Sequence, residues 1–60
     1  MRASEAIKLH PHDEVWVRLS GDWIPGYVVS YPSKSKDGVF VDVQTHTEGF
    51  LADIRHTDLR

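Results

Sequence analysis

The stretch Trp23-Ile24-Pro25-Gly26-Tyr27-Val28-Val29 decides the fold expected of this chain. Its aromatic and β-branched residues favour a strand, whereas proline is excluded from helix interiors because it lacks an amide hydrogen. A strand accepts proline at an edge or a bulge, so Pro25 predicts one of these, and Gly26 beside it allows a sharp bend. The stretch therefore predicts a bent strand over residues 23–31.

Residues 14–19 and 38–43 carry the same strand signal on either side of this stretch. In both segments small apolar side chains alternate with larger or polar ones, which is the period of a strand with one buried face. Polar turns are expected at residues 20–22, 32–38 and 45–49, with a short strand over residues 50–54. The predicted core consists of Val15, Val17, Leu19, Gly26, Val28, Val39, Val41, Val43, Ile54 and Leu59.

The N-terminal residues are the one stretch with helical character. Ala6, Ile7 and Leu9 supply an apolar side, with Ser4 as a candidate N-cap. Chain ends are often poorly ordered, so residues 1–12 are expected to be flexible or to form a short helix.

Residues 13–60 are expected to form a single barrel domain. Residues 55–60 close it as one 3₁₀ turn, with Thr57 as cap and Leu59 folded back onto the core. Short strands with turns at intervals of about 8–12 residues are typical of a small antiparallel β-barrel.

Composition narrows the classes of function. The chain has 60 residues, a net charge of −2 and no cysteine, which excludes disulfides and thiolate metal sites. An acidic balance argues against a protein that binds nucleic acid through its whole surface. No apolar run approaches the length of a membrane span and no secretory signal is visible, so a cytoplasmic location is expected. A core this small favours stabilisation by association.

A family resemblance rests on the order of these elements. A strand, a glycine turn, the Trp-x-Pro-Gly-x-Val-Val stretch, a polar loop, a valine-rich strand and a final Asp58-Leu59-Arg60 resemble the SH3-like barrel of Tudor, agenet and KOW modules. The resemblance covers residues 13–60. It implies an all-β, SH3-like antiparallel barrel of four to five strands that serves as a non-catalytic binding module.

A looser resemblance is to the SH3-like barrel of type II dihydrofolate reductases, and it implies an oligomeric enzyme with a site shared between subunits. That family lines its pore with a Val-Gln-Ile-Tyr segment, whereas Phe50-Leu51-Ala52-Asp53 stands at the matching place here. The chain also lacks a Cys nucleophile, a Gly-rich phosphate loop and a recognisable carboxylate pair. We therefore expect no enzymatic activity and no cofactor.

The first candidate site is an outward aromatic face for a protein partner or for self-association. If the alternating valines face inward, large side chains of the same strands face outward, where they form interaction surfaces. The residues expected there are Trp16, Tyr27 and Phe40, flanked by Glu14, Arg18 and Asp42. The alternative is that the N-terminal segment covers this face with Ile7 and Leu9.

Three other candidate sites have simpler structural interpretations. An aromatic cage of the Tudor type would use Trp23, Tyr31 and Phe50. In the alternative, Trp23 and Phe50 plug the barrel ends. A nucleic-acid surface would use Lys34, Lys36, Arg18 and Arg55. In the alternative, the lysines belong to a solvated loop that they keep soluble. The histidines His10, His12, His46 and His56 match no metal-site spacing, so no metal is expected.

Overall fold

The fold is all-β with a short helix at its N-terminal end. The computed structural model describes all sixty residues. The elements are α1 (Ala3–Ala6), β1 (Glu14–Leu19), β2 (Asp22–Val28), β3 (Ser33–Ser35), β4 (Gly38–Thr45), β5 (Phe50–Arg55) and the 3₁₀ helix η1 (His56–Asp58). Every strand pair is antiparallel, so the predicted all-β class with a C-terminal 3₁₀ turn is confirmed.

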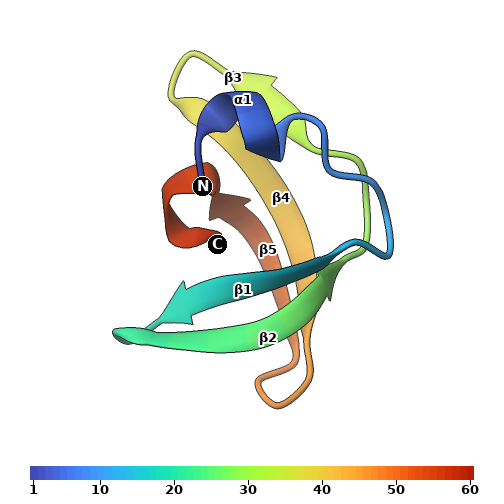
Figure 1. The fold of residues 1–60 in the computed structure, drawn as a ribbon, viewed down its shortest axis with the longest axis vertical. Helices are drawn as coiled ribbons and strands as arrows, with labels where there is room; N and C mark the ends of the chain where they lie inside the picture. The colour runs from blue at the N-terminus through green and yellow to red at the C-terminus, as the bar shows by residue number, and fades with distance from the viewer.

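Strand β4 organises the sheet because it has neighbours on both edges. Its first half pairs with β3 and its second half with β2, while β5 lies along the opposite edge. The hairpin of β1 and β2 crosses β4 and β5 at a steep angle, and the N- and C-termini lie close together on the concave side (Figure 1). The sheet therefore curls around one small core.

The C-terminal residues return to the free edge of β1. Val17 forms an antiparallel bridge with Leu59. Trp16 and Arg60 exchange two backbone hydrogen bonds of 2.8 and 2.9 Å. The terminal amino group of Met1 donates to the carbonyl of Leu59. These contacts hold the C-terminal residues against β1 and tie the N-terminus to Leu59.

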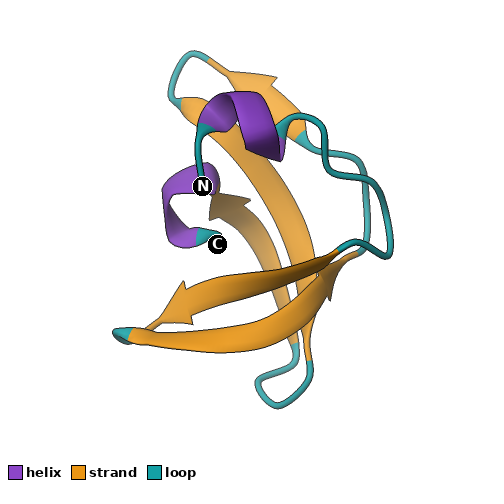
Figure 2. Ribbon diagram, in the orientation of Figure 1, coloured by secondary structure: helices purple, strands orange, loops and turns teal.

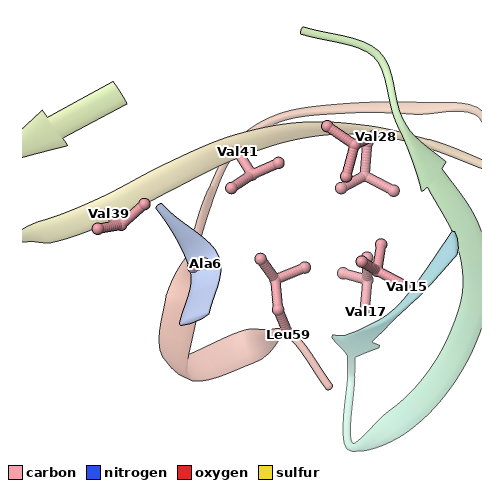
Figure 3. Packing of buried hydrophobic residues seen from close by; sticks show 8 residues of the cluster. Ala6, Val15, Val17, Val28, Val39, Val41 and Leu59 are labelled. Carbon is pink, nitrogen blue, oxygen red and sulfur yellow. The ribbon is translucent and has the colours of Figure 1, made fainter. Parts of the chain in front are cut away.

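The core is a layer of small side chains between the two halves of the curled sheet. Figure 3 shows Val15 and Val17 of β1 facing Val28 and Val41 across this layer. The buried apolar residues are Ala6, Val15, Val17, Val28, Val39, Val41, Val43 and Leu59. Two predicted members, Leu19 and Ile54, are half-buried, while Ala6 and Thr45 are buried without having been predicted.

The first half of the chain differs from expectation in two places. Strand β2 ends at Val28, although the strand was expected to continue to residue 31. Helix α1 begins after Arg2 instead of Ser4, and the Glu5 carboxylate accepts the backbone N–H of Arg2 at 3.0 Å. Glu5 thus bonds the amide of the N-cap residue Arg2 from the third helical position.

The second half also differs from expectation. The loop expected at residues 32–38 contains the short strand β3, which folds back on β4 through the turn at residues 36–37. Gly38 ends this turn with a φ of 137°, a conformation open to glycine. The 3₁₀ helix has Arg55 at its N-cap, so Thr57 does not cap it.

Pro25 fits strand β2 because of the way that β1 pairs. Trp16, opposite Pro25, directs its N–H and C=O toward Arg60, away from β2. The Trp16–Pro25 pair is therefore one that exchanges no backbone hydrogen bonds, and the missing amide of Pro25 costs this ladder nothing. On its other side β2 pairs with β4 from Gly26 onward, and the Pro25 carbonyl accepts the His46 N–H at 3.0 Å just beyond those pairs. Pro25 therefore lies at the end of that ladder, where its missing amide leaves one bond unmade.

The structure contains no helix with the length and hydropathy that a bilayer span requires.

Candidate functional site: an aromatic face on the sheet

The outward side of the β1–β2 hairpin carries large exposed side chains. Because Val15 and Val17 point into the core, Trp16 between them points to solvent and is 49% exposed. Tyr27 of β2 follows the same rule and is 38% exposed, while Pro25 opposite Trp16 is also exposed. Diagonal neighbours on a sheet lie about 7–8 Å apart, so Trp16 and Tyr27 are within reach of each other.

Phe50 of β5 extends this surface along the same face of the sheet, across β4. Glu14 pairs with Tyr27, Tyr27 with Gln44, and Gln44 with Phe50, so the four residues form one row across β1, β2, β4 and β5. Phe50 is 55% exposed. We call Trp16, Pro25, Tyr27 and Phe50 the aromatic face.

Phe40 lies outside the aromatic face, although the sequence placed it with Trp16 and Tyr27. It pairs with Ser33 and Arg55 at the opposite end of β4 and is half-buried. Four residues of strand separate it from Gln44, or about 13 Å. Phe50 occupies the position expected for Phe40, and this exchange depends on the register between β4 and β5, which no local sequence pattern indicates.

Helix α1 does not cover the aromatic face. It packs against β4 and η1, and Ala6 is fully buried in the core. Both helical segments lie on the concave side of the curled sheet (Figure 2). Ile7, which was expected to cover the aromatics in the alternative interpretation, is itself 41% exposed. The aromatic face therefore remains open to solvent.

Two of the polar residues expected to flank the aromatic face, Arg18 and Asp42, already have partners within the chain. Arg18 forms an ion pair with Asp58 at 2.8 Å. Asp42 is used within the fold, since its two carboxylate oxygens accept the Ser30 hydroxyl at 3.1 Å and the Asp53 N–H at 2.9 Å.

The Asp42 contact supports a bulge in β5. Asp53 has a φ of 54° at the point where the β4–β5 register shifts. Aspartate tolerates this left-handed conformation better than most residues do, and the Asp42 carboxylate holds its amide. Asp42 therefore has a structural role that its position in the sequence did not reveal.

The three cage candidates do not come together. Two guanidinium groups lie over the Trp23 ring, that of Arg60 at 4.3 Å from the ring centroid and that of Arg18 at 5.6 Å. Tyr31 is 70% exposed and packs edge-on to His10 at 6.0 Å. Four residues of β2, or about 13 Å, separate Trp23 from the row that contains Phe50.

The candidate nucleic-acid residues lie on different elements, and one of them is already in an ion pair. Lys34 and Lys36 lie on the exposed hairpin of β3 and β4, and Arg55 lies at the end of β5. The positive charge of Arg18 is partly offset by Asp58.

The histidines have separate neighbours. His46 packs edge-on to Tyr27 at 6.4 Å, and His56 accepts the Val39 N–H on its Nδ1 atom at 3.2 Å. No three His, Asp or Glu side chains lie close enough to share a metal ion, and the surface has no pocket.

Comparison of the chain with models of protein families, with curated proteins and with solved structures found no match.

Proposed function

We propose that this chain is an SH3-like barrel that acts as a non-catalytic binding module and contacts protein through its aromatic face. The observation that carries the proposal is the exposure of Trp16 and Phe50, at 49% and 55%, on a face that no other part of the chain covers. Tryptophan and tyrosine are the residues that most often dominate the binding energy of protein interfaces.

The shape of the surface supports a protein as the ligand. Small molecules bind in concave pockets, whereas proteins pair over broad, nearly flat areas with an apolar centre and a polar rim. The aromatic face follows a sheet; Glu14 provides a polar group at its border, and Gln44 provides one between Tyr27 and Phe50.

Site-specific photo-crosslinking tests this proposal. A benzophenone amino acid would replace Trp16 or, in a second variant, Phe50, and the variants would be expressed in the cells that produce the chain. Tyr31 is the matched control position, because it is an aromatic residue with 70% exposure outside the aromatic face. We expect protein adducts from positions 16 and 50 and none from position 31, with the attached protein identified by mass spectrometry.

The purified pair then provides the quantitative test. Trp16→Ala should weaken binding by at least about tenfold, as expected for an aromatic centre of an interface. Tyr31→Ala should leave it unchanged. Absence of adducts at both face positions, or equal losses from the two substitutions, would contradict the proposal.

A further inference from the structure

The outward side of the β1–β2 hairpin has a self-complementary order of residues. It carries three cross-strand pairs, which are Glu14–Tyr27, Trp16–Pro25 and Arg18–Trp23. We call these six residues the hairpin grid. An apolar pair lies in its middle, an acid beside an aromatic at one end, and a base beside an aromatic at the other.

A two-fold rotation converts this order into matched contacts. We place the two-fold axis in the plane of the interface, perpendicular to the strands and along the Trp16–Pro25 pair. The β1 strands of two copies then face each other in antiparallel directions. Alternate residues of a strand are about 7 Å apart, so Glu14 then lies over Arg18 of the second copy. By the same rotation Tyr27 lies over Trp23 of the second copy and over the Arg60 guanidinium that packs on that ring at 4.3 Å.

From this order we propose that the hairpin grid is a two-fold interface between two copies of this chain. The inference rests on the proposed function, because it names a second copy as the occupant of the part of the aromatic face that the hairpin carries, which is Trp16, Pro25 and Tyr27. With parallel β1 strands, an axis along β1 would oppose Glu14 to Glu14 and Arg18 to Arg18, and opposed like charges are costly at an interface. An axis between β1 and β2 would instead place Glu14 over Tyr27 and Arg18 over Trp23, so neither charge would meet its opposite. Only the antiparallel arrangement sets Glu14 against Arg18. The charges therefore select the antiparallel arrangement.

Both charges are available for such pairing. The single ion pair within the chain joins Arg18 to Asp58, so Glu14 has no charged partner of its own. Arg18 uses its Nε and Nη2 atoms on one oxygen of Asp58, and a guanidinium has five N–H donors. Its remaining donors can reach a second carboxylate.

The size of the chain suits a weak dimer. A standard interface covers about 800 Å² on each partner, which is about a fifth of the 4004 Å² surface of this chain. The hairpin grid is one side of a single hairpin, so we place the dimer at the weak end of the range. Self-association must therefore be measured up to about millimolar concentration, where weak dimers form.

Reciprocal charge swaps test the arrangement by sedimentation equilibrium. Glu14→Lys opposes two positive charges at both ends of the dimer, and Arg18→Glu opposes two negative ones. Each variant alone should dimerise at least about tenfold more weakly than the original chain. An equimolar mixture of the two should regain the original affinity as a heterodimer, because every charge then faces its opposite.

Two control variants show whether a loss of dimerisation comes from the hairpin grid or from changes elsewhere on the surface. Asp58→Asn removes the ion pair of Arg18 without changing the hairpin grid and should leave dimerisation unchanged. Phe50→Ala removes an aromatic-face residue outside the grid and should also have little effect. Circular dichroism of each variant confirms that the sheet is retained.

The outcomes decide between the two proposals. A chain that remains monomeric at all concentrations, or a dimer that the charge swaps do not weaken, overturns the inference. The proposed function would survive that result if the crosslinker at position 16 captures a different protein that binds the purified chain. If the crosslinker captures neither a second copy nor another protein, both proposals fail.

Discussion

Substitution of Gly26 tests whether the close approach of β2 and β4 holds the fold together. A Cβ atom at this position would lie 2.7 Å from the carbonyl oxygen of Gln44, 2.9 Å from Cγ1 of Val43 and 3.1 Å from Cα of Thr45. Two of these three atoms belong to the backbone of β4, so no change of rotamer removes the clash. Gly26→Ala therefore forces the two strands apart at the point where their ladder begins.

The sign of the change in the free energy of unfolding shows whether the added methyl group of Gly26→Ala clashes with β4 or only restricts the unfolded chain. Gly26 is not among the residues with positive φ, so alanine meets no backbone strain there. Without a clash, alanine would stabilise the protein by about 0.4–1 kcal/mol, because it restricts the unfolded chain. With the clash, overpacking should lower the free energy of unfolding by about 3 kcal/mol. For a domain of this size that loss lowers Tm by about 12–24 °C.

Thermal and urea unfolding followed by circular dichroism measure this difference. Gly21→Ala is the control, because Gly21 has a φ of 86° and a methyl group added there would have no atom within 4 Å. Its cost is that of the left-handed conformation alone, about 1–2 kcal/mol. A Gly26→Ala protein that is as stable as the original chain, or more stable than Gly21→Ala, would refute the argument from the strand approach.

Three further substitutions address the other contacts. Asp42→Ala removes the acceptor of the Asp53 N–H and should lower the free energy of unfolding by about 1 kcal/mol, measured by urea denaturation. His56→Ala leaves the part-buried Val39 N–H without its acceptor and should cost about 2 kcal/mol; an unchanged urea midpoint would contradict this. Trp16→Ala should change stability by less than about 1 kcal/mol, because the side chain is half exposed, so its binding defect can be read without a folding defect.

The local pattern of the sequence determined the strands and their buried faces. Alternation of valine with larger residues in β1 and β4 identified which side chains enter the core, because a strand has a period of two residues. The same alternation placed Trp16 and Phe40 outside, and Tyr27 with them provided that the bend at Gly26 kept β2 in phase. These assignments required no knowledge of which strands are neighbours.

Only the tertiary structure decided which exposed residues lie together. Phe50 joins Tyr27 through the row across Gln44, and Phe40 lies at the other end of β4. Both facts depend on strand pairing and register, which arise from contacts between residues distant in the sequence. The same holds for Asp42, whose carboxylate supports a bulge eleven residues further along the chain.

At the two ends of the chain, Leu59 was placed by the local sequence and Ala6 only by the tertiary structure. Ala6 belongs to a short helix that is marginal in isolation, and it is buried because β4 and η1 pack around it. Leu59 carries a local signal for a returning turn, and the sequence placed it correctly in the core. A two-residue alternation is a property of one strand, whereas a shared surface is a property of several, and this is why the sequence revealed the aromatic side chains but not their grouping.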